Sequence, residues 1–457
     1  SGTPFFSEMY PGVLYPPNLI FFLSDFTTAF NGFYIFHYVL LGLSVYALCR
    51  YCGISVGGAL CSAITALLSG FFLSLPVSGH IFYSSVWLPS IFYCAQRYLQ
   101  EKKISYFLSA IFCLSCQILA GSPEFSALTL IMLFFWSLTL APEARWGQRI
   151  LRCVPTLAFM VLLSFGLTAI QLVPTFFLTK ESTRSQGLGF NDHAQWSMEL
   201  RDLATLLVPK NYAGFMDVEH MENFSLFQSL HMGLFAMLFV CAGLLYLKHR
   251  SIRFLVFAFL TGIFFALGKH NPLYQIIYEW FPLVKLFRYP EKFYLIPAYC
   301  QIFLVGYGID MLVKSEPKNR AYFWIILALG LGVAGVGLSM PSRNTMPLFT
   351  YLAIFGFALF FSEKLGEWGL KAILGALVFL SLILNNYMLL PMIDKKFYED
   401  KPKSAREIAN NDLYRVYVGR IEGLPGALPI PDTLLAQQIM IKESQYPEIG
   451  SIHGIHY

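Results

Sequence analysis

Two cations and an acid stand close together in the segment 286–293, which reads Leu-Phe-Arg-Tyr-Pro-Glu-Lys-Phe and runs into an apolar stretch. The cations are Arg288 and Lys292, and the acid is Glu291. A guanidinium binds phosphate oxygens through two parallel hydrogen bonds, and an ammonium adds a compact positive charge. The spacing therefore indicates an anion-binding site. The alternative is that both cations anchor the chain at a membrane surface by reaching toward water.

Polar side chains also interrupt the other apolar stretches. His80 and Glu124 each stand at the start of one stretch, while Gln117 and Gln171 lie inside two others. Such groups in a membrane span cost free energy and need a partner or a function. For any single residue a hydrogen bond between helices is a sufficient explanation. Taken together they favour a polar cavity that opens at one face of the membrane, because all of them lie toward the same ends of their helices, as do His37, Asn385 and Asn386.

The elements that carry these residues are apolar stretches long enough to cross a bilayer. Hydrophobic residues make up 56% of the chain and charged residues 13%, against about 25% charged in soluble domains. A span needs roughly 20 apolar residues, and runs without strict alternation favour helices over a barrel. The sequence therefore predicts an all-α polytopic membrane protein with about twelve spans, at 31–49, 55–75, 80–97, 104–120, 125–141, 153–178, 229–247, 252–268, 291–313, 321–340, 346–362 and 369–391.

Positive charge divides the connecting loops into two sets. One alternating set holds fifteen Lys and Arg residues, and the short loops of the other set hold five. The positive-inside rule places the richer set in the cytoplasm. We therefore expect residues 1–30, the long loop 179–228, the loop 269–290 and the tail from 392 to face outward. The net charge of +5 reflects this topology and gives no indication of a nucleic-acid partner.

The nine cysteines lie almost entirely within the predicted spans or at their cytoplasmic ends. The pairs Cys49/Cys52 and Cys113/Cys116 have CxxC spacing, but four converging ligands are typical of a zinc site. We interpret these pairs as small helix residues one turn apart. The sequence therefore predicts no zinc site at these cysteines and no extracytoplasmic disulfide.

The order of motifs over most of residues 1–315 resembles that of the YfhO-like bacterial membrane proteins, which are similar to the GT-C class of integral-membrane glycosyltransferases. The matching residues are Ser1–Pro4 and Tyr15–Asn18; Leu41, Gly42, Ala47, Arg50 and Gly53; Gly79, His80 and Trp87–Pro89; Gln117, Gly121, Pro123 and Glu124; Gln171, Pro174, Ser182, Arg184, Gly187 and Leu188; Pro209 and Gly214; and Gly268, Asn271–Tyr274, Phe287–Phe293 and Gly306–Asp310.

The resemblance implies a GT-C-like bundle that transfers a sugar from a polyprenyl-phosphate-linked donor to an envelope glycan or lipid, at the outer face of the bacterial cytoplasmic membrane. It also implies an acid on the first outward loop as catalytic base or metal ligand. We expect residues 1–30 to be the end of that loop and its main acid to precede Ser1; Glu8 is the only acid in the first twenty residues. The chemistry needs a base for the acceptor proton and positive charge for the departing phosphate.

Outward-facing residues of suitable types fill these roles. The expected phosphate ligands are Arg184, Arg288 and Lys292, with Gln117 and Gln171 as further substrate contacts. Glu8, Glu124 and Asp192 are candidates for accepting a proton or binding a divalent cation, and His80 for orienting a hydroxyl group.

Two other functions stay open at this point. One is a transporter or flippase for a lipid-linked saccharide, although the chain shows no clear inverted repeat and no charges at mid-membrane depth. The other is a non-catalytic envelope assembly protein. The chain is expected to be a fragment, and residues 392–457, with a strand-like run at 413–418, are expected to begin an extracytoplasmic β-containing domain after the helical domain 31–391.

Overall fold

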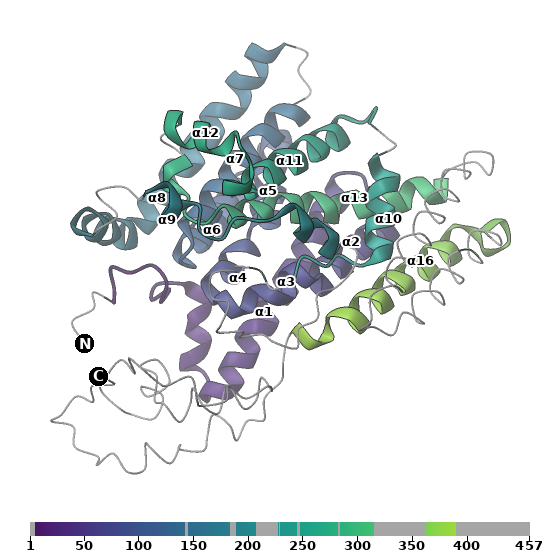
Figure 1. Cartoon of the computed structure of the whole chain (residues 1–457), viewed down its shortest axis with the longest axis horizontal. Helices are drawn as coiled ribbons and strands as arrows, with labels where there is room; N and C mark the ends of the chain where they lie inside the picture. Colours follow the sequence, from purple (N-terminus) through teal and green to yellow (C-terminus); the bar gives the residue numbers. More distant parts are fainter. Residues whose placement is uncertain are drawn as a thin grey trace.

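The computed structural model describes residues 5–141, 145–182, 189–206, 227, 229–244, 247–281, 284–314, 356 and 362–389. Within this part of the chain the secondary structure is helical, with no strand (Figure 1). The predicted tail domain 392–457 and most of the predicted spans 321–340 and 346–362 lie outside the described residues.

The chain begins with a short 3₁₀ helix and continues through α-helices that follow one another closely. The first half contains η1 (Pro16–Phe22), α1 (Phe26–Tyr51), α2 (Val56–Leu68), α3 (Gly70–Ser74), η2 (Leu75–Ser78), α4 (Gly79–Ser85), α5 (Leu88–Glu101), α6 (Ile104–Leu119), α7 (Pro123–Leu140) and α8 (Trp146–Glu181). The second half contains α9 (Phe190–His193), η4 (Leu200–Leu206), α10 (Leu234–Leu244), α11 (Arg250–Ala266), η6 (Gly268–His270), α12 (Tyr274–Trp280), η7 (Val284–Leu286), η8 (Pro290–Tyr294), α13 (Leu295–Lys314), α16 (Ser362–Asn386) and η10 (Tyr387–Leu389).

Six helical stretches are long and apolar enough to cross a membrane: Phe26–Tyr51, Val56–Glu101, Pro123–Leu140, Trp146–Glu181, Pro290–Lys314 and Gly366–Asn386. The protein is therefore a multi-pass membrane protein, but the structure does not confirm about twelve spans. One reason is that the predicted spans 55–75 and 80–97 fall in a single run of helices, α2 to α5, interrupted by short breaks. Another is that α6 is a shorter apolar helix.

The helix starts follow from residues that the sequence supplies. Asp25 caps α1 by accepting a hydrogen bond from the Thr28 backbone N–H at 3.0 Å. Ser55 caps α2 in the same way through Gly58, and Pro123 stands in the first turn of α7. These side chains satisfy N–H groups that an α-helix leaves without partners, and proline has no N–H to satisfy.

Helix α13 forms the centre of the bundle, with α2, α10 and α11 packed around it. In the span that contains α13, 83% of the residues in the most apolar 18-residue stretch are buried. Glycines allow the close approach: a Cβ added at Gly308 would lie 1.9 Å from the Phe239 carbonyl oxygen, and one at Gly58 would lie 2.8 Å from the Gly306 carbonyl oxygen. Small residues at helix contacts are the usual way in which membrane helices gain van der Waals packing.

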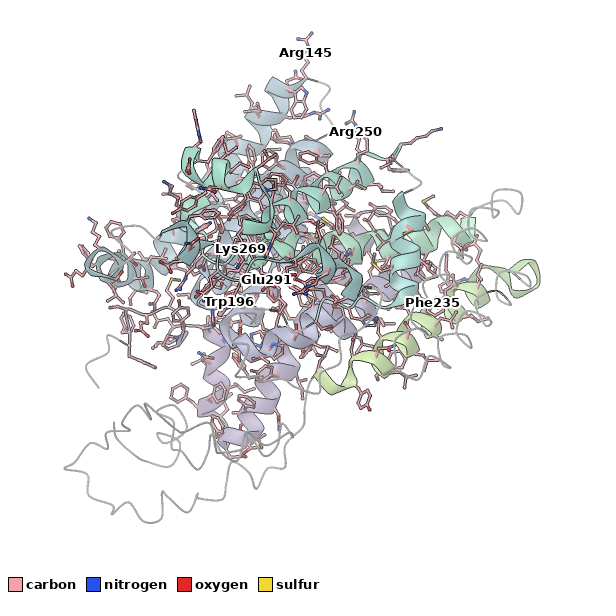
Figure 2. The ribbon with its side chains drawn as sticks, viewed as in Figure 1. Arg145, Trp196, Phe235, Arg250, Lys269 and Glu291 are labelled. Atoms are coloured by element: carbon pink, nitrogen blue, oxygen red, sulfur yellow. The ribbon has the colours of Figure 1, made fainter. Side chains whose placement is uncertain are left out.

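Residues from the two sets of loops lie apart. Arg145 and Arg250, both from the basic set, lie toward the top of the view in Figure 2, whereas Trp196, Lys269 and Glu291 lie together near the middle. The sidedness that the loop charges predict stays a prediction.

Candidate functional site

An ion pair joins two residues that the sequence singled out. Lys292 Nζ, on η8, lies 2.8 Å from Glu124 Oε1, in the first turn of α7. The two side chains are only 8% and 19% exposed. The helix start favours the ionised carboxylate, because the N-terminal end of a helix carries partial positive charge. His80, the second residue of α4, lies near enough to interact with both charges.

Tyr289 lies between the two cations of this region. Its ring centroid is 4.5 Å from Arg288 Cζ and 5.4 Å from Lys292 Nζ, and 4.1 Å from the centroid of the Trp196 ring. A cation over an aromatic face is attracted by the negative charge density of the ring. We call the six residues of this region the Tyr289 cluster: His80, Glu124, Trp196, Arg288, Tyr289 and Lys292.

The backbone of the Tyr289 cluster is in an uncommon conformation. Tyr289 has φ of 68° and Trp196 has φ of 56°, a region that bulky residues seldom adopt. Such residues cost on the order of 1–3 kcal/mol each and are found where the surrounding structure enforces them. Here the Tyr289 N–H donates to the His193 carbonyl, and the Glu291 N–H donates to the Trp196 carbonyl, both at 3.1 Å. The two segments therefore hold each other in place.

A second layer fixes the segment 193–198 to the end of α11. The Met198 N–H donates to the Ala266 carbonyl at 2.9 Å, and the Lys269 N–H donates to Ser197 Oγ at 3.0 Å. Figure 2 shows Trp196, Lys269 and Glu291 close together in this region. The indole of Trp196 is thus positioned by α11 as well as by η8.

His193 lies under the same segment. It is fully buried, and its Nε2 is hydrogen-bonded to the Tyr274 hydroxyl at 2.9 Å. Burial lowers the pKa of His193 from 6.5 to about 4, because removal from water disfavours the charged imidazolium. Its neighbour Asp192, a predicted catalytic residue, is exposed on α9. The structure places the histidine, not the acid, against the rest of the protein.

The segment 5–15 covers the His80 side of the Tyr289 cluster. The Tyr10 ring meets the His80 ring edge-on at a centroid distance of 4.8 Å. Gln171 Nε2 donates to the Phe6 carbonyl at 2.8 Å. The Met9 carbonyl rests against Gly121, where an added Cβ would lie only 2.6 Å away. Glu8 is half-buried in this segment, two residues from Tyr10.

Gln117 connects three of the helices that position His80 and Glu124. Its amide donates at 2.9 Å both to the Ser84 carbonyl on α4 and to Thr129 Oγ1 on α7. Gln117 is fully buried, and the Ser84 hydroxyl donates to the Gln117 backbone carbonyl at 3.3 Å. The amides of Gln117 and Gln171 thus hold protein groups, and a direct contact of either with substrate stays a prediction.

The structure brings together four of the predicted site residues: His80, Glu124, Arg288 and Lys292. Arg184 lies outside the described residues. In the described part of the chain no three residues among His, Cys, Asp and Glu gather closely enough to hold a metal ion. The sequence analysis missed Trp196 and Tyr289, whose role depends on a positive φ and on a stacking partner 93 residues away. The adjacent Arg-Tyr-Pro-Glu-Lys run was the only signal for Tyr289.

Comparison with known proteins identifies one family. No curated protein and no solved structure matches the chain. A family model described as "Bacterial membrane protein YfhO" matches residues 11–418, a range that includes every residue of the Tyr289 cluster. The chain therefore belongs to the YfhO family of bacterial membrane proteins.

Proposed function

We propose that this protein transfers a sugar from a polyprenyl-phosphate-linked donor to an envelope glycan or lipid at the outer face of the cytoplasmic membrane. The observation that carries the proposal is the largely buried Glu124–Lys292 pair beside His80, next to a tyrosine whose ring contacts both Arg288 and Lys292. These groups lie at the ends of apolar helices, where the phosphate of a membrane-anchored donor would arrive. The resemblance to GT-C glycosyltransferases supports the same reaction.

Arg288 and Lys292 are the groups that would hold the donor phosphate. When the bond between the anomeric carbon and the phosphate oxygen breaks, negative charge grows on the departing polyprenyl phosphate. Fixed cations in a partly dry site stabilise this charge more than water does. The Tyr289 ring keeps both cations near one another, because its centroid lies 4.5 Å from Arg288 Cζ and 5.4 Å from Lys292 Nζ.

Glu124 is the group that would accept the proton of the acceptor hydroxyl. In the structure this carboxylate is paired with the Lys292 ammonium at 2.8 Å. If the donor phosphate draws Lys292 toward itself, Glu124 loses its cationic partner and becomes a stronger base. Donor binding would thereby activate the base. The acceptor oxygen then attacks the anomeric carbon, its proton passes to Glu124, and polyprenyl phosphate leaves.

His80 and Glu8 have supporting places in this scheme. His80 stands beside both members of the pair and is suited to orienting the acceptor hydroxyl. Glu8 is the second candidate for the base, because its segment reaches His80 through Tyr10. Asp192 is the third, although its exposed position removes it from the pair.

Transfer by the purified protein in liposomes tests the proposal, with polyprenyl-phosphoryl sugars as donors and envelope lipids as acceptors. We expect Arg288→Ala to lose transfer by about a hundredfold, as is typical when one group that stabilises transition-state charge is removed. The matched control is Lys285→Ala, which removes an exposed cation that contacts Tyr278. Wild-type transfer by a well-folded Arg288→Ala protein would contradict the assignment. Movement of the lipid-linked saccharide across the bilayer without bond cleavage would indicate a carrier instead.

A further inference from the structure

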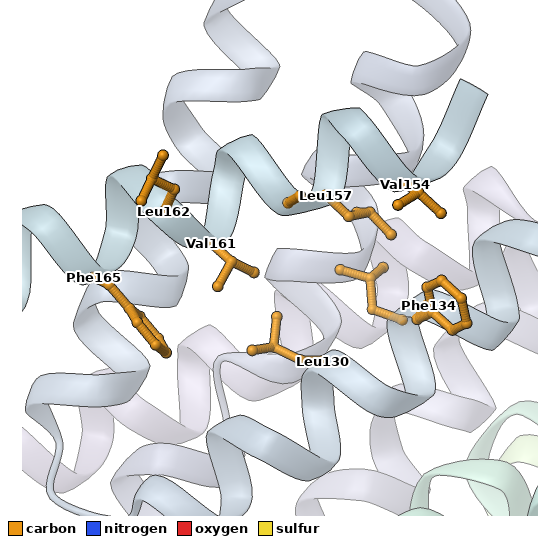
Figure 3. A pocket seen from close by; sticks show the side chains of 9 residues that line it. Leu130, Phe134, Val154, Leu157, Val161, Leu162 and Phe165 are labelled. Carbon is orange, nitrogen blue, oxygen red and sulfur yellow. The ribbon is translucent and has the colours of Figure 1, made fainter. Parts of the chain in front are cut away.

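An apolar groove runs between α7 and α8, and no residue of the Tyr289 cluster lines it. Its volume is about 490 Å³, and every residue that lines it is apolar. Figure 3 shows side chains of the two helices facing one another across it. The lining residues are Leu130, Leu133 and Phe134 on α7, and Val154, Leu157, Ala158, Val161, Leu162 and Phe165 on α8.

The groove opens onto the surroundings of the protein. In the most apolar 18-residue stretch of α8 only 28% of the residues are buried, against 83% in the corresponding stretch of the span that contains α13. Leu162 and Phe165, on the groove, are 66% and 47% exposed. In a membrane-spanning helix such a surface faces lipid, because water around it would be strongly unfavourable. Hydrocarbon chains are therefore what the groove meets.

Arginines gather at one end of the groove. Arg149 lies one turn before Val154, is 8% exposed, and donates from Nη1 to the Leu138 carbonyl on α7 at 3.4 Å. Arg152 donates to the Leu99 carbonyl at 2.5 Å, and Arg145 is exposed. Trp146, which is 64% exposed and 5.1 Å from the Arg149 guanidinium, is typical of the boundary between hydrocarbon and headgroups. The groove thus begins at a positively charged membrane boundary.

We propose that this groove binds one acyl chain of an anionic glycerophospholipid, with the lipid phosphate at Arg145, Arg149 and Arg152. The groove extends from Val154 to Phe165, which is about 16 Å at about 1.5 Å per residue. This is close to half of the roughly 30 Å hydrocarbon core, and so to one leaflet. Basic groups beside a gap between membrane helices on the cytoplasmic side are suited to anionic headgroups. The proposal does not depend on the transfer reaction.

Two exposed leucines of α8 allow a matched test of the groove. Leu162 lines it, whereas Leu167 does not, and they are 66% and 65% exposed. Native mass spectrometry of the full-length protein in detergent would measure retention of dioleoylphosphatidylglycerol and dioleoylphosphatidylcholine. We expect wild type to retain the anionic lipid several-fold better. Leu162→Trp should lose that retention because the indole fills the groove, and Leu167→Trp should keep it. Equal retention by the two variants would overturn the proposal.

Two exposed arginines test the charged end in the same experiment. Arg145 stands before α8, and Arg250 begins α11 on the same side of the molecule (Figure 2). We expect Arg145→Gln to reduce retention of the anionic lipid about fivefold, the usual effect of one basic residue at a lipid surface, and Arg250→Gln to leave it unchanged. Glycerol 3-phosphate, which has no acyl chain, should not compete. Competition by it, or wild-type retention that is equal for both lipids, would overturn the proposal.

Discussion

Two sets of charged side chains show how differently the same residue types act in this protein. Arg97, Glu101 and Lys103 lie within seven residues of one another, and Glu101 lies 2.5 Å from Arg97 and 2.9 Å from Lys103. Glu124 and Lys292 are 168 residues apart in the chain and meet at 2.8 Å. The first set follows from proximity in the chain and is 26–65% exposed, whereas the second depends on the whole fold and is only 8% and 19% exposed. Shielding makes the second pair sensitive to the loss of either partner.

The largest effect is expected at the shielded pair. Lys292→Gln leaves the Glu124 carboxylate half-buried without its cation, and we expect a loss of about 3 kcal/mol in the free energy of unfolding. The double variant Lys292→Gln/Glu124→Gln should recover most of this loss, because no unpaired charge is left. Unfolding of the purified protein in mixed micelles measures both. If the double variant is no more stable than the single one, shielding does not explain the difference between the two sets.

The next largest effect is a pH dependence of the folding stability, which the buried His193 near the Tyr289 cluster causes. The pKa of buried His193 is about 4 in the folded protein and near 6.5 in an unfolded chain, so the unfolded chain binds more protons between these values. Stability is therefore complete above about pH 6.5 and falls as the pH approaches 4. We expect the thermal midpoint to fall by several degrees between pH 7 and pH 5.

A histidine outside the buried region provides the control for this dependence. His193→Gln should reduce the difference in midpoint between pH 7 and pH 5, while His270→Gln, at an exposed histidine, should leave it as in wild type. A His193→Gln protein with the full wild-type pH dependence would assign the titration to another group.

A smaller effect is expected from the aromatic ring over the shielded pair. Tyr289→Leu removes the stacking on Trp196 and the contacts with Arg288 and Lys292, for a loss of roughly 1–2 kcal/mol in the free energy of unfolding. Tyr289→Phe keeps the ring and should lose less than half as much. Chemical unfolding of the two variants side by side measures the contribution of the ring, and equal losses would show that the ring is not what stabilises the cluster.

The smallest effect is expected at the exposed set. Glu101→Gln should leave the thermal midpoint unchanged within measurement error, because water and salt already screen these charges. The same experiment at low ionic strength sharpens the comparison. A clear loss of stability there would show that the exposed set contributes more than its solvent contact suggests.

Part of this organisation was predictable from residue types and spacing. Runs of apolar residues predicted membrane helices, since a bilayer leaves the backbone no other partners, and α1, α7, α8 and α13 confirm this. The predicted number of spans was not confirmed, because the predicted spans 55–75 and 80–97 fall in one run of helices, α2 to α5, and most of the predicted spans 321–340 and 346–362 lies outside the described residues. The sequence identified His80, Glu124, Arg288 and Lys292 as candidate site residues by their types. It did not show which of them lie in contact.

The sequence by itself determined that the protein lies in a membrane, that its spans are helical, and that two cations and an acid stand together in the segment 288–292. Each of these depends on composition or on neighbours within a few turns, so local chemistry is sufficient. Only the tertiary structure decided that Lys292 meets Glu124, that Trp196 stacks on Tyr289, and that α7 and α8 leave a groove between them. Those contacts join segments far apart in the chain, and their free energy exists only once the whole bundle has packed.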